Sequence, residues 1–162
     1  MNRIVMVFAA AVLASSLLAA QSNPANPVPT KPAEDYSGMY SFLKEGEFVQ
    51  LTVEDGGVTG FVSRYGEQES DRGAFLDQFF KEAKLEGKKL SFTTQTVHGV
   101  WYEFKGAVER GEGKNVGDEA YYVLKGKLTQ YSASADKKIS AQSREVVLKV
   151  FPADMGDEPA KP

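Results

Sequence analysis

The chain has 162 residues, no cysteine, one histidine and a formal net charge of −3. This mild negative charge excludes the concentrated Lys and Arg surface by which proteins recognise nucleic acids or anionic membranes. Without cysteine there is no disulfide framework, and with one histidine there is no histidine-based metal cluster. We therefore expect stability to come from a hydrophobic core, and we expect no metal or other cofactor.

The N-terminus has the pattern of a secretory signal peptide. Arg3 is followed by an uncharged run from Ile4 to Ala20, which begins apolar and ends in small residues. We expect residues 1–20 to be removed on export, with cleavage after Ala20 or Ser22, and the protein to be periplasmic or extracellular. An uncleaved membrane anchor is the alternative, but small residues dilute the end of the run and no basic flank follows. No membrane insertion is expected once the leader is gone.

The seven prolines mark the domain boundaries. Four lie before Tyr36 and three lie after Phe151. Because proline cannot donate to a β-ladder, the proline-free stretch 36–151 predicts a single sheet-built domain. Residues 21–35 are then expected to form a Pro-rich disordered tether and residues 152–162 a disordered C-terminal tail.

Eight strand signals follow one another within this domain, each an apolar, β-branched or aromatic run bounded by Gly, Asp, Asn or Ser. The predicted strands are Ser37–Leu43, Glu47–Glu54, Gly57–Tyr65, Phe79–Glu86, Lys89–Thr96, Gly99–Arg110, Glu119–Tyr131 and Gln142–Phe151. Val49, Leu51 and Val53 alternate with polar residues, as expected of an antiparallel strand with one buried face.

A short pattern recurs in three of the predicted strands. Gly60, Gly106 and Gly126 each lie between apolar residues two positions before and two after, so glycine and both neighbours share one strand face. Glycine inside a strand permits a bend or a close approach, which a small closed sheet needs. We expect these glycines to face the interior of an all-β fold, a single antiparallel up-and-down barrel of about eight strands. An open two-sheet sandwich is the alternative.

The lengths of the connections predict where a barrel mouth would lie. In an up-and-down barrel, alternate connections share one end. The third and seventh, Gly66–Gln78 and Ser132–Ala141, are long and would rim one mouth together with the turn at His98, although the long loop Gly111–Asp118 belongs to the other end.

Two phenylalanines stand out in the third connection. Phe75 and Phe79 are four residues apart, a spacing that predicts one helical turn with an apolar face. Such a turn would cap the mouth.

Gly38-x-Tyr40 at the first strand is similar to the Gly-x-Trp that opens many lipocalins. With its leader and eight meandering strands, the chain resembles small secreted bacterial lipocalin-like (calycin-type) β-barrel proteins of unassigned function. It departs from lipocalins because Tyr40 replaces Trp, the lipocalin disulfides are absent and no long C-terminal helix is visible. The resemblance implies a barrel and no particular ligand.

The sequence carries no catalytic signature. It has neither a Gly-x-Ser-x-Gly elbow nor a phosphate-binding glycine loop, and His98 beside Gly99 is expected in a turn, so we expect the protein not to be an enzyme. Trp101 and Tyr102 fall on opposite faces of one strand, so one should be buried and the other exposed.

Two functions remain open. The first is a secreted or periplasmic non-enzymatic binding protein that takes a small, mostly apolar ligand in its barrel. The expected ligand-binding residues are Arg64, Tyr65, Phe75, Phe79, His98 and Trp101. The second is an envelope accessory or interaction protein with a solid core and no small-molecule ligand. The presence or absence of a central cavity discriminates between them.

Overall fold

A computed structural model describes residues 34–153. The expected signal peptide, the tether up to residue 33 and the tail from residue 154 lie outside the described residues. No helix in the described part of the chain is long and apolar enough to cross a membrane.

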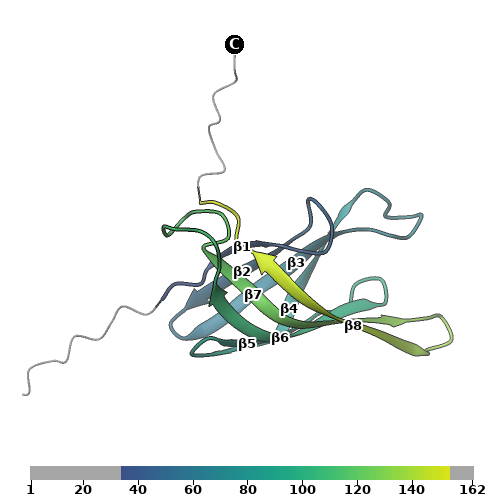
Figure 1. The fold of residues 1–162 in the computed structure, drawn as a ribbon. Helices are drawn as coiled ribbons and strands as arrows, with labels where there is room; N and C mark the ends of the chain where they lie inside the picture. The colour runs from purple at the N-terminus through teal and green to yellow at the C-terminus, as the bar shows by residue number, and fades with distance from the viewer. Residues whose placement is uncertain (1–33, 154–162) are drawn as a thin grey trace, which may run out of the picture. The chain divides into compact units, whose positions relative to one another are not determined.

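Eight antiparallel strands follow one another along the chain, and each pairs with the next (Figure 1). They are β1 (Gly38–Ser41), β2 (Phe48–Glu54), β3 (Gly57–Tyr65), β4 (Phe75–Glu86), β5 (Lys89–Thr94), β6 (Val100–Arg110), β7 (Tyr122–Ala133) and β8 (Ile139–Lys149). This order confirms the predicted up-and-down arrangement. Because all eight strands belong to one sheet, the two-sheet sandwich is not the fold.

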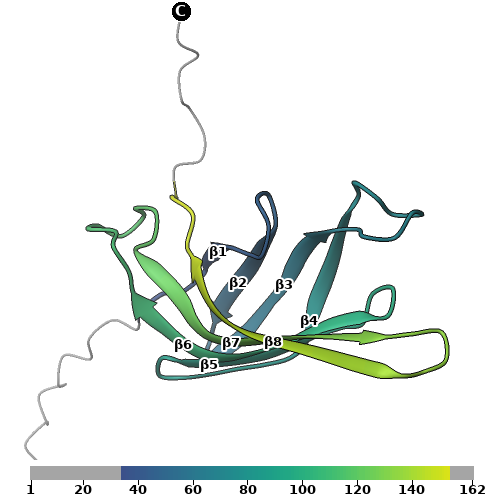
Figure 2. The same ribbon diagram turned by 45° about the vertical axis from the view of Figure 1, so that its right-hand side comes forward.

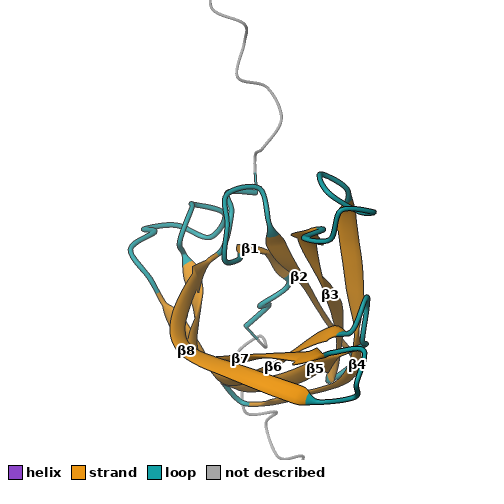
Figure 3. Ribbon diagram, turned by 90° about the vertical axis from the view of Figure 1, so that its right-hand side faces the viewer, coloured by secondary structure: helices purple, strands orange, loops and turns teal. Residues whose placement is uncertain are grey.

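The sheet curls strongly until its first and last strands meet, as the view in Figure 3 shows. Tyr40 of β1 forms a bridge with Val150, the amide of Phe151 donates to the carbonyl of Met39 (2.8 Å), and the amide of Lys149 donates to the Ser41 hydroxyl (2.9 Å). Since β1 is short, this contact joins only the C-terminal end of β8. The result is a half-barrel, and the hairpin of β7 and β8 extends beyond it (Figure 2).

Strand β4 forms a corner of the sheet. Its first half, from Phe75 to Phe79, pairs with β3, and its second half, from Phe80 to Glu86, pairs with β5. The register shifts between Phe80 and Glu82. A bulge of this kind bends a strand and increases its twist, which lets one strand serve both walls.

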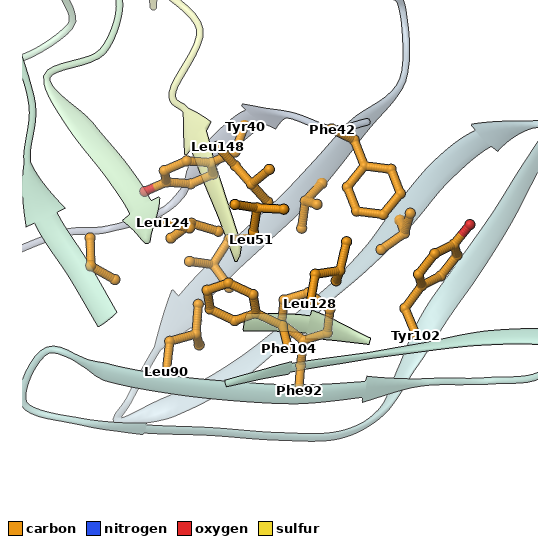
Figure 4. Packing of buried hydrophobic residues seen from close by; sticks show 14 of the residues in the cluster. Tyr40, Phe42, Leu51, Leu90, Phe92, Tyr102, Phe104, Leu124, Leu128 and Leu148 are labelled. Atoms are coloured by element: carbon orange, nitrogen blue, oxygen red, sulfur yellow. The ribbon is translucent and has the colours of Figure 1, made fainter. Parts of the chain in front are cut away.

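The core lies on the inner face of the curled sheet (Figure 4). Phe80, Phe92 and Phe104 stack across β4, β5 and β6, with ring centroids 4.3 and 5.3 Å apart.

The three repeated glycines face the interior, as predicted. Gly106 of β6 lies directly opposite Gly126 of β7, and a Cβ on Gly106 would lie 2.3 Å from the carbonyl oxygen of Lys125 and 2.7 Å from the Phe104 ring. A Cβ on Gly60 would likewise lie 2.7 Å from the Phe80 ring. The space that a side chain would need is therefore already occupied by neighbouring backbone and by an aromatic ring.

Candidate functional site

One end of the half-barrel carries the loops 42–47, 66–74, 95–99 and 134–138, as the strand order requires. We call this end the mouth. The loop between β7 and β8 is shorter than predicted, because the hairpin is already paired at Ala133 and Ile139. The longest connection among the described strands, 111–121, lies at the opposite end. Loop length therefore does not mark the mouth.

The predicted helical turn over Phe75 and Phe79 is wrong, because both residues belong to β4. Phe75 pairs with Tyr65 and Phe79 pairs with Phe61 of β3, so the backbone groups of this segment are satisfied by a ladder. The spacing of four positions also fits a strand, in which alternate residues share one face. Both side chains point away from the interior and are 51% and 53% exposed, so they do not cap the mouth.

The six predicted ligand-binding residues lie in separate places. Arg64 is buried on the inner face and His98 lies in the rim turn between β5 and β6. Tyr65, Phe75 and Phe79 lie on the outer face of β3 and β4. Trp101 lies on the outer face of β6, stacked on Tyr131 with ring centroids 5.1 Å apart, while Tyr102 is the buried member of the pair. Of these six side chains, the structure brings only Tyr65 and Phe75 into ring contact.

A polar cluster fills the interior just below the mouth. The Nε of Arg64 donates to Oε1 of Gln78 (2.7 Å), and its Nη1 donates to the carbonyl of Tyr65 (3.1 Å). Nε2 of Gln78, which is fully buried, donates to the carbonyls of Gln95 (3.2 Å) and Val100 (2.7 Å). Buried polar groups are stable only when they are hydrogen-bonded, and here they tie β3 and β4 to the β5–β6 turn.

The rim is held by a contact between two loops. The Nδ1 of His98 contacts Oδ2 of Asp71, and Nε2 of Gln68 donates to the carbonyl of His98 (3.3 Å). The other carboxylate oxygen of Asp71 is buried and has no hydrogen-bond partner among residues 34–153. These contacts fix the 66–74 loop on the hairpin turn.

A pocket of about 390 Å³ opens beside the polar cluster, between the β1–β2 loop and β8. Its walls are Leu43, Lys44, Glu47, Glu67, Tyr102, Gln130, Gln142 and Arg144. None of these eight residues is among the expected ligand-binding residues. The sequence does contain a pattern that indicates this polar pocket. On the last strand, the inward positions are apolar at Leu148 and Val146 and become polar at Arg144 and Gln142.

The charges of this mouth pocket are partly paired. Nζ of Lys44 lies 2.8 Å from Glu67, and this hydrogen bond lowers the pKa of the Glu67 carboxyl. Glu47 is buried and accepts hydrogen bonds from the amides of Tyr65 and Lys44 (both 3.1 Å). The side chain of Arg144 forms no hydrogen bond or ion pair with residues 34–153. The pocket is therefore polar rather than apolar.

A second pocket, of about 440 Å³, lies at the end opposite the mouth. It is lined largely by apolar and aromatic groups of β1, the 111–121 loop and the chain after β8, including Met39, Val116, Tyr121 and Phe151. Arg110 stacks over the ring of Tyr121, 3.3 Å from its centroid, and so holds one wall in place.

An outer aromatic patch covers the convex side of β2, β3 and β4. It consists of Phe48, Phe61, Tyr65, Phe75 and Phe79. Ring centroids are 5.8 Å apart for Phe48 and Phe61, 5.4 Å for Phe61 and Phe79, and 4.5 Å for Tyr65 and Phe75. The ring contacts form two groups, Phe48–Phe61–Phe79 and Tyr65–Phe75, and the hydrogen-bonded pair Ser63 and Asp77 lies between them on the same face. The sequence shows these aromatics, but only the strand register places both groups on one surface.

The interior between the two ends is filled. The side chains of Tyr40, Leu51, Phe104 and Leu124 are 0% exposed. A void large enough for a water molecule would leave part of a bordering side chain accessible, so no such void borders these residues. The packing in Figure 4 shows the same side chains converging from opposite walls.

Comparison with protein-family models, with curated proteins and with solved structures finds no significant match to this chain. Among the described residues, no group of three or more His, Asp or Glu side chains is arranged to hold a metal ion.

Proposed function

We propose that the chain is an exported accessory or interaction protein that binds another macromolecule through the outer aromatic patch. The observation that carries this proposal is the exposure of Phe75 and Phe79 among five aromatic side chains on one sheet surface. Exposed aromatic surface is typical of interaction sites, and aromatic side chains supply much of the binding energy of interfaces.

The filled interior supports this function over a ligand held within the barrel. Binding an apolar molecule there would require the displacement of side chains that are in mutual contact, such as Leu51, Phe104 and Leu124. The outer aromatic patch requires no rearrangement, because its rings already face outward.

Site-specific photocrosslinking in producing cells tests the proposal. A photoreactive residue at Phe79 should yield a discrete adduct with a partner, whereas the same residue at Lys105, an exposed position on the outer face of β6, should not. A second substitution, Phe61→Ser, should reduce the Phe79 adduct because it removes the ring beside Phe79. Equal labelling from both positions, or an adduct that is indifferent to Phe61→Ser, would refute the proposal.

The apolar pocket opposite the mouth favours a second candidate function, the binding of a small apolar molecule. Its volume of about 440 Å³ falls within the range of small-molecule sites. An environment-sensitive apolar dye should then bind, and Tyr121→Ala should weaken its binding several-fold while Phe79→Ala should not. The reverse order of effects would assign the dye to the outer aromatic patch.

Export is part of the proposal and has its own measurement. The charged start, the apolar run and the small residues before Gln21 support removal of the leader. Intact mass of protein from the cell envelope or the medium should correspond to a chain that begins at Gln21 or Asn23. A chain beginning at Met1 in the membrane fraction would contradict export with cleavage.

A further inference from the structure

The edge of β8 that faces away from β7 is unpaired over most of its length. The amides of Lys149 and Phe151 point toward β1, while the amide of Val150 donates to Tyr122 on the β7 side. Because successive amides of a strand point to opposite edges, the odd-numbered residues from Ile139 to Val147 present their amides and carbonyls to the free edge. Within residues 34–153, no strand pairs with this edge before the contact at β1.

This edge carries only part of the usual protection against pairing, because Arg144 and Glu145 are its only charged side chains before Lys149. Natural sheets cover their edges or interrupt them with proline, bulges, lysines or very short strands. β8 contains neither proline nor lysine before Lys149, and its register with β7 runs without a shift from Ile139 to Lys149. Two large apolar side chains, Ile139 and Val147, are 65% and 53% exposed at its two ends.

The residues along the edge are complementary to themselves in antiparallel orientation. A twofold axis at Ser143 would place Ile139 opposite Val147 of a second copy and Arg144 opposite Gln142. Odd-numbered residues would then face one another, so that they could exchange backbone hydrogen bonds. If the twofold axis lay at Arg144 instead, Arg144 of one copy would face Arg144 of the other. If the axis lay at Gln142, Ile139 of one copy would face Glu145 of the other. Charge and apolar contact therefore favour the pairing centred on Ser143 over its two neighbouring registers.

We propose that two copies of this chain pair through the free edge of β8, antiparallel and with Ser143 on the twofold axis, to form a continuous sheet across the dimer. In this arrangement the inner-face side chains Arg144 and Gln142 of the second copy lie beside the mouth pocket. The second copy extends the open wall of each half-barrel.

Charge substitution at the axis tests the dimer, with sedimentation equilibrium on protein produced from the complete sequence. Ser143→Glu and Ser143→Lys each place like charges opposite one another and should weaken dimerisation by at least about fivefold. An equimolar mixture of the two variants should restore it, because Glu then faces Lys. Ser91→Glu on the outer face of β5, away from the edge, should leave dimerisation unchanged.

A second measurement does not depend on charge. Since the chain has no cysteine, Ser143→Cys introduces a single thiol that should form a disulfide-linked dimer under mild oxidation, whereas Ser91→Cys should not. The expected Cα separation of a hydrogen-bonded antiparallel pair, about 5.5 Å, lies within the range that disulfides span. A parent chain that remains monomeric up to about 500 μM would overturn the proposal, and so would a mixture of charge variants that fails to restore dimers.

Discussion

Gln78 shows how much of the mouth depends on one side chain. Its amide accepts from Arg64 and donates to two carbonyls of the β5–β6 turn, and the residue is fully buried. A sequence pattern cannot identify such a residue, because its two carbonyl partners lie in another hairpin and become neighbours only when the sheet curls.

Gln78→Leu should therefore be strongly destabilising. Leucine is similar in size but leaves the Nε of Arg64 and the carbonyl of Gln95 without this partner, while the carbonyl of Val100 keeps its bond from the Val97 amide. Unsatisfied buried groups cost about 1–3 kcal/mol each. We expect urea denaturation to show a loss of about 2–4 kcal/mol. Gln50→Leu is the matched control, because Gln50 is half-buried and donates only one bond, of 3.3 Å. Similar losses in both variants would contradict this role of Gln78.

Gly106 and Gly126 lie opposite one another in a space too small for a side chain. Gly106→Leu would force a side chain against the Lys125 carbonyl and the Phe104 ring, so overpacking should lower the free energy of unfolding by about 1–3 kcal/mol or more. Lys105→Leu on the outer face should change it by less than about 0.5 kcal/mol. Thermal and urea unfolding of the two variants measure the difference. Small, equal effects would argue against the inner placement of Gly106.

Among the elements, β4 departs most from the expectation. The apolar residues of 75–80 fit a helical turn and a strand equally well, since a spacing of four satisfies both periods. Pairing with β3 decides between them, because the ladder satisfies every second backbone group of the segment and Tyr65 packs on Phe75. The exposed face of β4 is thus a consequence of its partner strand.

The β5–β6 hairpin turn supports a prediction on backbone strain. Both His98 and Gly99 have positive φ (50° and 77°), as a two-residue hairpin turn of the primed type requires. A Cβ on Gly99 would also lie 2.8 Å from the carbonyl oxygen of Ala133, whereas a Cβ on Gly87, where φ is 60°, meets nothing within 4 Å. Gly87→Ala should cost about 1 kcal/mol from strain alone, and Gly99→Ala distinctly more. Calorimetry that ranked the two variants in the opposite order would contradict this account.

Buried tyrosines make the stability of the whole fold depend on pH in the alkaline range. Burial raises the pKa of Tyr102 to about 12, and burial also raises the pKa of Tyr40, from an ordinary value near 10. The unfolded chain loses these protons first, so the contribution of these tyrosines to stability is constant below about pH 10 and is lost as the pH rises toward 12.

Tyr102→Phe should make this alkaline loss of stability shallower. The measurement is the urea midpoint between pH 9 and pH 12, together with the phenolate absorbance of the folded protein. If the variant loses stability over this window as steeply as the parent, or if all tyrosines of the folded protein titrate near pH 10, the burial argument fails for Tyr102.

The local pattern of the sequence was enough to predict the eight strands, their order and the inward-facing glycines. Alternation and glycine spacing are properties of single strands, and an antiparallel meander follows from short connections. The curled tertiary structure decided where side chains from different strands meet. It separated the six expected ligand residues and assembled the polar cluster, the outer aromatic patch and the unpaired edge of β8. These features depend on register and closure, and a one-residue change in register moves every side chain of a strand to the other face.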